Sequence, residues 1–407
     1  MLLLLVTNVT VNCLACHSLS RSTAVPHPLL TSVTVKDVQV AIIGAGVAGL
    51  CAARGLAEAG IPFIVLEGRD RLGGRVLTLN DGGESRAGGF DLGPSWVWPA
   101  TQPAVQRAIA ELGLETFTQY SEGDVVFERM SREPSRRYTA TEDIPAAQRS
   151  ARIKGGTSAL VQGLADALPA ASLVLQAPVT HLELTSDGVH VTFLNSSKVQ
   201  DSVHVDFVIA AAPPRMLASS IVYGPELDPE TVGLWRSTPT WMASQAKFIA
   251  VYEQPFWRED GLSGTVQSLA GPMSEIHDAT TAHGQAALMG FLGIAPTDRR
   301  SLGREAMTEA CLEQFTRVFG QKAATPRSIL LKDWAADELT STTEDLVSSG
   351  HPAPAKAWTH GVWAERLILG GSEVSDHEAG YLAGALEAGT NAAHIATELI
   401  RKDGVKK

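Results

Sequence analysis

The chain has 407 residues, of which 44% are hydrophobic and 19% are charged, and its formal net charge is −11. That length and hydrophobic content allow a buried core and more than one domain. The acidic balance, with no basic stripe of interleaved aromatic residues, argues against nucleic-acid binding. Four cysteines are too few for a fold held together by disulfides.

Residues 1–37 form a leader rich in serine, threonine and proline. Its first six residues are strongly apolar, but asparagine and threonine soon interrupt the run, which is too short to span a membrane. The basic residues that open a secretory signal are missing. We therefore expect a disordered leader and a soluble body with no stable membrane span. A cytoplasmic location is favoured, and secretion is the alternative if residues 1–20 are a signal peptide.

The most informative pattern follows the leader. An apolar run ends in a glycine turn, an Ala/Leu-rich helical stretch comes next, and a second apolar run ends at Glu67. Gly44 permits the tight turn, Gly46 lets the backbone approach a pyrophosphate, and Gly49 lets the helix pack closely on the sheet. The pyrophosphate would meet free N–H groups at the helix N-terminus. Glu67 stands where a carboxylate accepts from ribose hydroxyls. The order strand, turn, helix, strand, acid predicts dinucleotide binding.

The residues after Glu67 favour FAD over a nicotinamide. The segment Gly68–Arg75 contains a glycine pair and three arginines. Guanidinium groups suit bidentate phosphate contact, so we expect a second clamp on the nucleotide. A nicotinamide cofactor has to leave after turnover and needs no such clamp. The segment closely resembles the E-A-x-x-R-x-G-G-R signature of the flavin amine oxidase family.

Further elements are expected along the chain. Helices are predicted at 103–114, 158–168, 304–319 and 380–400, and strands at 172–184, 188–194, 203–211, 246–252, 286–292 and 367–371. Residues 125–138 are expected to form either a strand pair or an irregular segment. Nucleotide-type elements thus lie at both ends, with other elements inserted between them. We expect an α/β fold in which a discontinuous Rossmann-like FAD/NAD(P)-binding domain (38–115, 153–237 and 334–401) carries a substrate domain of mixed sheet plus helices (116–152 and 238–333).

From about residue 38 to 401 the chain resembles the flavin-dependent amine oxidases, which include monoamine and polyamine oxidases. The supporting blocks are the glycine turn with its arginine segment, Asp91–Trp96, Gly155–Thr157 with Val179 downstream, Ala246–Phe248 with Pro255–Arg258, and Leu369–Gly389. The residues expected to bind the cofactor are Gly44, Ala45, Gly46, Ala48, Gly49, Glu67, Gly68, Arg69, Gly74, Arg75, Gly93, Ser95, Trp96, Val179, Gly371, Glu373 and Leu382.

Two residues are the candidates for catalysis. Lys247 lies in an apolar strand, where burying an ammonium is costly. The resemblance implies that it holds a water near the flavin N5 and assists oxygen chemistry. Tyr381 resembles the tyrosine of a substrate cage, in which an amine gains from aromatic faces. Free N–H groups at the helix N-terminus near Leu382 would stabilise negative charge on the flavin.

The second aromatic residue of such a cage is missing. Its position falls near Glu344, and the position of covalent flavin attachment falls near Thr343, with no cysteine close by. We therefore expect non-covalent FAD and an altered cage. Trp98, Phe291 and Trp358 are candidates to supply the missing face, together with Trp96, and Glu344 is a candidate partner for a substrate ammonium. We find no cluster with the spacing of metal ligands.

These features predict oxidation of an amine C–N bond to an imine by hydride transfer to flavin N5, with O2 as acceptor and H2O2 as product. The partners are then a small-molecule amine and O2, and the sequence gives no oligomeric state. One alternative is a flavin-dependent dehydrogenase or desaturase of a biosynthetic pathway, because fold does not fix function. An amino-acid oxidase is less favoured, since residues 94–98 offer no arginine for a carboxylate. Another alternative, suggested by the incomplete cage, is a flavin-binding scaffold without turnover.

Overall fold

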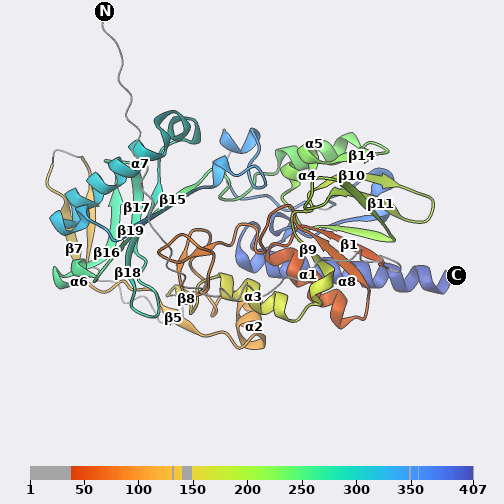
Figure 1. Ribbon diagram of the computed structural model, residues 1–407, viewed down its shortest axis with the longest axis horizontal. Helices are drawn as coiled ribbons and strands as arrows, with labels where there is room; N and C mark the ends of the chain where they lie inside the picture. Colours follow the sequence, from red (N-terminus) through yellow and green to blue (C-terminus); the bar gives the residue numbers. More distant parts are fainter. Residues whose placement is uncertain (1–37, 131–132, 140–148, 348–349, 356, 407) are drawn as a thin grey trace, which may run out of the picture. The chain divides into compact units, whose positions relative to one another are not determined.

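The computed structural model describes residues 38–130, 133–139, 149–347, 350–355 and 357–406 (Figure 1). The expected leader, residues 1–37, lies outside these ranges. The described residues belong to one compact unit. Among them, no helix combines the length and the apolar character needed to cross a membrane.

A five-stranded parallel sheet holds the dinucleotide-type elements. Its order is β20-β13-β1-β2-β9, and its strands are β1 (Val40–Ile43), β2 (Phe63–Leu66), β9 (Leu173–Val174), β13 (Phe207–Ala210) and β20 (Leu367–Leu369). The longer strands are continuous apolar runs because both faces of a parallel sheet are covered.

The two faces of the parallel sheet pack against different hydrophobic cores, as successive residues of β1 show. Val40 and Ile42 join a core with α1 (Val47–Glu58), α3 (Ser158–Asp166) and α8 (Leu382–Lys406). Ala41 and Ile43 point the other way, since side chains alternate along a strand, and join a second core. That core includes a four-stranded sheet and the helices α4 (Pro214–Ser220) and α5 (Pro229–Ser237). Figure 1 shows α8 running beside α1.

The four-stranded sheet corrects two predicted boundaries. Its order is β12-β11-β10-β14, with β10 (Val179–Leu184), β11 (Val189–Leu194), β12 (Gln200–Val205) and β14 (Val222–Gly224). The predicted strand 203–211 is two strands, because the chain leaves this sheet at Asp206 and enters the parallel sheet as β13. The predicted strand 172–184 likewise divides into β9 and β10. A short apolar run does not reveal such a change of sheet.

A seven-stranded mixed sheet has the order β19-β15-β18-β17-β16-β6-β7. Its strands are β6 (Asp124–Glu128), β7 (Arg136–Thr139), β15 (Ala246–Tyr252), β16 (Leu262–Ser268), β17 (Met273–Asp278), β18 (Ala286–Leu292) and β19 (Ser328–Asp333). One face packs on α6 (Phe256–Glu259) and α7 (Pro296–Phe319). Helix α7 is kinked at Gly303, whose φ of +79° is not helical, so the predicted helix 304–319 corresponds to the part of α7 after the kink.

Smaller elements connect these layers. They are α2 (Pro103–Glu111), β3 (Thr78–Leu79), β4 (Phe90–Asp91), β5 (Thr116–Thr118), β8 (Ala151–Ile153), and the 3-10 helices η2 (Ala170–Ser172), η3 (Gln321–Ala324), η4 (Trp334–Ala336), η5 (Glu344–Leu346), η6 (Gly361–Glu365) and η7 (Ser372–Val374). The predicted fold class, α/β with a Rossmann-like parallel sheet and a further mixed sheet, is confirmed. The predicted division into two domains stays a prediction.

Candidate active site

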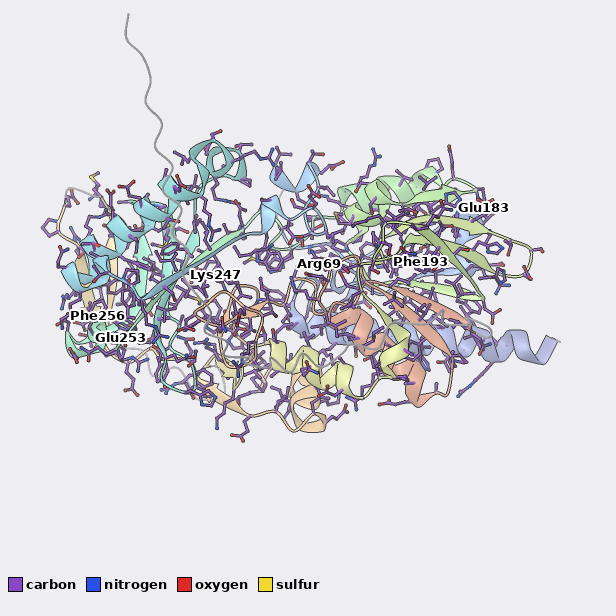
Figure 2. All side chains as sticks on the ribbon, viewed as in Figure 1. Arg69, Glu183, Phe193, Lys247, Glu253 and Phe256 are labelled. Carbon is purple, nitrogen blue, oxygen red and sulfur yellow. The ribbon has the colours of Figure 1, made fainter. Side chains whose placement is uncertain are left out.

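A cavity of about 840 Å³ extends from the glycine turn to the seven-stranded sheet. Figure 2 labels two of the residues that line it, Arg69 near the glycine turn and Lys247 on the seven-stranded sheet. The residues proposed from sequence that line this cavity are Gly44, Gly46, Ala48, Glu67, Gly68, Arg69, Gly74, Arg75, Gly93, Ser95, Trp96, Trp98, Val179, Lys247, Phe291, Tyr381 and Leu382. One continuous space therefore joins the predicted nucleotide and amine regions.

The glycine turn leaves backbone groups facing the cavity. Gly44 has a φ of +97°, which disfavours any side chain. A Cβ on Gly49 would lie 1.9 Å from the Gly44 oxygen, so the helix packs directly on the turn. Helix α1 has no side-chain cap, and the first N–H groups of a helix have no partner within it. Ala45 and Gly49 do not line the cavity but support the turn from behind.

Glu67 fixes that turn. The carboxylate is 4% exposed, and its Oε2 accepts from the Ala45 N–H at 2.7 Å while Oε1 accepts from the Arg69 N–H at 2.9 Å. A carboxylate has about four acceptor positions, so it can take further donors from the cavity. Glu67 thus combines support of the loop with an acceptor at the cavity wall.

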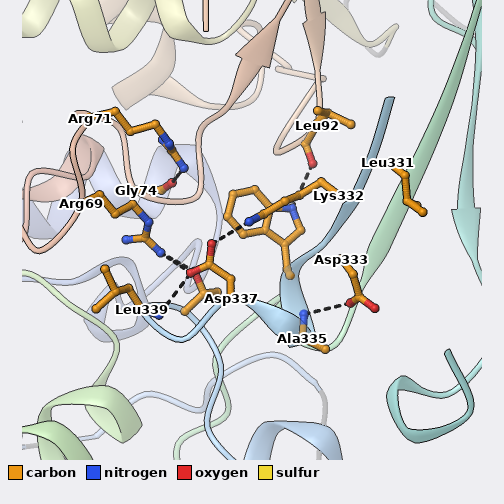
Figure 3. A network of polar contacts seen from close by, with 12 residues as sticks. Arg69, Arg71, Gly74, Leu92, Leu331, Lys332, Asp333, Ala335, Asp337 and Leu339 are labelled. Atoms are coloured by element: carbon orange, nitrogen blue, oxygen red, sulfur yellow. Dashed lines mark hydrogen bonds and ion pairs between the residues drawn. The ribbon is translucent and has the colours of Figure 1, made fainter. Parts of the chain in front are cut away.

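The arginines brace the loop rather than pointing freely at a phosphate. Arg69 donates to Asp337 at 2.6 Å and to Thr340 at 2.8 Å, and Asp337 also accepts from Lys332 at 2.7 Å (Figure 3). Arg71 donates to backbone carbonyls, including that of Gly74. Protein acceptors thus hold these side chains in place, and because a guanidinium has five donors, the expected contact of this segment with a phosphate stays a prediction.

Arg75 has a comparable role on the other side of the cavity. It donates to the Trp241 carbonyl at 3.0 Å and to Ser372 Oγ at 2.9 Å, and it pairs with Glu373 at 2.7 Å. Glu373 is fully buried and lies behind Arg75, outside the cavity wall. Gly371 does not line the cavity either, and it packs closely on the Ala212 backbone, because a Cβ there would lie 2.9 Å from the Ala212 oxygen.

Lys247 is 3% exposed on β15. Its Nζ donates to the carbonyls of Asp91 at 3.1 Å and Gly93 at 2.6 Å, and to Ser95 Oγ at 2.9 Å. Burial lowers the pKa of this ammonium to about 7, against the partial opposition of the Asp91 charge. Three protein acceptors thus use all three donors of the charged group, so Lys247 anchors the Asp91–Ser95 turn to the sheet.

Sheet register places a row of three side chains along one cavity wall. Lys247 is directly opposite Phe291 on β18, and Phe291 is directly opposite Glu275 on β17. All three line the cavity, and Lys247 Nζ lies 5.0 Å from the Phe291 ring centroid. Trp96 packs against Phe291 at a centroid distance of 6.0 Å. The wall therefore runs from an amine through aromatic rings to a carboxylate.

Glu275 was not among the residues proposed from sequence. Its Oε1 is 2.6 Å from His277 Nε2, and this hydrogen bond lowers the pKa of the carboxyl. Among the described residues, the cavity wall carries two carboxylates, Glu67 and Glu275. Glu67 lies at the glycine turn, whereas Glu275 lies in register with Phe291 and Lys247, so Glu275 is the carboxylate beside the predicted amine region. Only the strand register reveals this, so no local sequence signal identified it.

Tyr381 contacts two further rings that sequence reasoning missed. Its ring centroid is 5.9 Å from that of Trp241 and 4.9 Å from that of His351, and the Trp241 and His351 centroids are 3.5 Å apart. Tyr381 Oη lies 3.1 Å from His351 Nε2. Trp241 and Tyr381 line the cavity, whereas His351 does not. Trp241 was detectable as a tryptophan shortly before the Lys247 strand; His351 has no comparable signal.

Two expected substrate residues are not brought to the cavity. Glu344 lies on η5, where its Oε2 accepts from Thr343 Oγ1 at 3.1 Å. Trp358 packs against the core formed with the four-stranded sheet, and its carbonyl accepts from Trp235 Nε1 at 2.6 Å. In the loop after β19, the neighbouring Asp345 is buried and pairs with Arg215. The expected roles of Glu344 and Trp358 toward a substrate stay predictions.

Comparisons with known proteins agree with this geometry. A family model described as "Flavin containing amine oxidoreductase" matches residues 47–150 and 145–396. A protein of Mycobacterium tuberculosis named as a flavin-containing monoamine oxidase, AofH, is 28% identical over 88% of this chain and 96% of its own length. Flavin-containing amine oxidase B of Canis lupus familiaris is 25% identical over 87% of this chain and 85% of its own length.

Solved structures show the same fold. Putrescine oxidase bound to putrescine superposes with a TM-score of 0.69 at 24% identity, over 88% of this chain and 98% of that one. Cyclohexylamine oxidase from Brevibacterium oxydans IH-35A gives 0.73 at 20% identity, over 90% and 100%. The uncapped N-terminus of α1 and the glycine cradle fit a dinucleotide. This chain belongs to the family of flavin-containing amine oxidoreductases, and its cofactor is FAD.

Proposed function

We propose that the protein is an amine oxidase that converts an amine C–N bond to an imine by hydride transfer to the N5 of non-covalent FAD, with O2 as acceptor and H2O2 as product. One observation carries this proposal. A single cavity runs from the N-terminus of α1 to a wall that combines Lys247, aromatic rings and Glu275. A nucleotide at one end then leaves room for a small amine at the other.

The chain's own residues hold and orient the two reactants. The N–H groups at the start of α1 would bind the pyrophosphate, and Glu67 would accept from the ribose. Tyr381 and Trp241 present aromatic faces to the amine nitrogen. Bound FAD supplies the hydride acceptor, and O2 takes up the two electrons. Lys247 holds the Asp91–Ser95 turn against the sheet and so fixes that wall of the amine site.

The substrate class follows from Glu275. The residue lies two strands from Lys247, which is roughly 10 Å across a sheet. Its lowered pKa keeps the carboxylate charged, and a cation approaching it passes the Phe291 ring. We infer that the preferred amine carries a second positive charge that pairs with Glu275. The putrescine bound by the related oxidase is a molecule of this class.

Anaerobic titration of the purified holoenzyme tests the reaction, with 1,4-diaminobutane and 1-aminobutane as probes. We expect the diamine to bleach the visible flavin absorbance, and admission of air to restore it with one H2O2 per cycle. Retention of the oxidised spectrum with every primary, secondary and tertiary amine tried would overturn the proposal.

Glu275→Gln tests the substrate class. Because the Glu275 side chain is 52% exposed, loss of this pairing costs about 0.5–1 kcal/mol, so kcat/KM for 1,4-diaminobutane should fall roughly 2- to 5-fold while that for 1-aminobutane changes little. Glu253→Gln is the matched control, because Glu253 is exposed near the end of β15, on the same sheet (Figure 2). An equal loss for both amines would contradict the role of Glu275.

One observation favours a dehydrogenase as the second candidate. Lys247 donates to Asp91, Gly93 and Ser95, so the charged form has no donor left for a water that assists oxygen chemistry. A dehydrogenase would show bleaching by amine, slow recovery in air and rapid recovery with an artificial electron acceptor. Comparing these recovery rates decides between the two acceptors.

A further inference from the structure

A side chain outside the cavity is placed to receive a proton from within it. His351 is exposed and contacts two residues of the cavity wall, Trp241 and Tyr381. Its ring is nearly parallel to both, at interplanar angles of 25° and 26°. Stacking fixes the imidazole so that Nε2 faces Tyr381 Oη at 3.1 Å. Tyr381, which is itself 38% exposed, therefore lies between the cavity and a titratable group in contact with solvent.

Oxidation of an amine substrate requires a route by which a proton leaves the substrate nitrogen. An alkylamine is largely an ammonium at neutral pH, as the ordinary pKa of lysine shows. The ammonium nitrogen has no lone pair to assist departure of a hydride from the α-carbon, so the nitrogen has to lose a proton first. A phenol can accept that proton on its oxygen while giving its own to a neighbour. Tyr381 has an imidazole nitrogen as that neighbour.

We propose that His351 is a positioning residue for proton release, which acts through Tyr381 on the amine that the proposed function assigns to this cavity. The ammonium N–H passes its proton to Tyr381 Oη while the Tyr381 O–H passes its own to His351 Nε2. Ammonium and neutral imidazole thus become neutral amine and imidazolium. The exposed imidazolium then releases the proton to water, and no electrons move in this step.

The surrounding charges are compatible with this path. In the segment just before α8, the charged group beside Tyr381 is Glu378. Burial together with the Glu378 charge raises the pKa of the Tyr381 phenol. Tyr381 therefore stays protonated and keeps a hydrogen to donate. On the Trp241 side, the charged groups are Arg75 and Glu373, which are paired with each other.

The pH dependence of kcat/KM for 1,4-diaminobutane tests the relay. In His351→Gln we expect a loss of about 100-fold at pH 7, the usual scale for a proton-transfer group. Near pH 10 the loss should shrink to about twofold, because much of the amine is already neutral in solution. Tyr381→Phe, which keeps the ring, should show the same pH-dependent loss. Free imidazole should restore activity to His351→Ala at pH 7.

Two controls separate a relay from a structural role. His394→Gln alters an exposed histidine of α8 that does not line the cavity, and it should leave kcat/KM and its pH dependence unchanged. The visible spectrum of bound FAD should be unchanged in His351→Gln. A pH-independent loss in His351→Gln, or none, overturns the relay alone. A wild-type flavin that 1,4-diaminobutane bleaches at no pH overturns the proposed function and the relay with it.

Discussion

The two ends of the cavity are lined by different kinds of groups. At the nucleotide end the wall is backbone, supplied by the Gly44 turn and the start of α1 within one β-α-β unit. At the amine end it is side chains from separate elements, among them Trp241, Lys247, Glu275 and Phe291. A backbone wall tolerates no added atoms, whereas a side-chain wall can change its ligand without loss of the fold. Substitutions at the two ends should therefore fail in different ways.

Gly49→Val should give the largest effect, at the nucleotide end. A Cβ at this position would lie 1.9 Å from the Gly44 oxygen, so helix and turn have to separate. We expect FAD affinity to fall at least roughly 100-fold, or about 3 kcal/mol, measured as flavin content after gel filtration and by titration with FAD. Gly233→Ala in α5 is the control, since a Cβ there meets nothing within 4 Å. Normal flavin content in Gly49→Val would contradict the backbone cradle.

Lys247→Met should change how stability depends on pH. Burial lowers the pKa of Lys247 to about 7, so between about pH 7 and pH 10 the unfolded chain binds the extra proton. Wild-type stability should then rise relative to the variant by at most about 1.4 kcal/mol per pH unit. Thermal melts of both proteins from pH 6 to 10 measure this difference. Parallel curves above pH 7 would show that Lys247 stays charged when folded.

Trp241→Ala should impair amine oxidation while FAD stays bound. Loss of one aromatic face costs about 2 kcal/mol of cation–π interaction in a desolvated site, or roughly 30-fold in kcat/KM. The backbone contact with Arg75 is unaffected, because it uses the Trp241 carbonyl. Trp241→Phe should recover most of the activity. Loss of FAD from Trp241→Ala would contradict the assignment of FAD binding and amine binding to separate ends of the cavity.

This contrast also explains what the sequence could predict. The glycine turn and Glu67 lie close together in the chain, so local spacing was sufficient to identify the nucleotide end. Glu275 became visible only through the register that aligns it with Phe291 and Lys247. The expected place of Glu344 was counted from Trp334, and such counting does not reveal that the neighbouring Asp345 is buried and pairs with Arg215. Cross-strand pairing and loop direction depend on contacts between segments far apart in sequence.

Asp337→Asn tests the brace behind the nucleotide end. Burial alone would raise the pKa of Asp337, but Arg69 and Lys332 together lower it to about 2. The carboxylate therefore contributes stability that is present above about pH 4 and lost as the pH falls towards 2, in total about 2 kcal/mol. Acid titration of unfolding should show this component in the wild type and not in the variant. Identical acid curves would mean that Arg69 is held by its other contacts.

Trp358→Phe should have the smallest effect, and it tests whether the amine end of the cavity includes Trp358. Trp358 packs on the core beside the four-stranded sheet, and its hydrogen bond to Trp235 uses the backbone carbonyl, which phenylalanine retains. The smaller ring should cost about 1 kcal/mol of stability and leave kcat/KM within about twofold. Steady-state kinetics beside Trp241→Phe provide the comparison, because both variants exchange an indole for a phenyl ring. A larger kinetic loss in Trp358→Phe would mean that the amine end reaches beyond the wall formed by Trp241 and Tyr381.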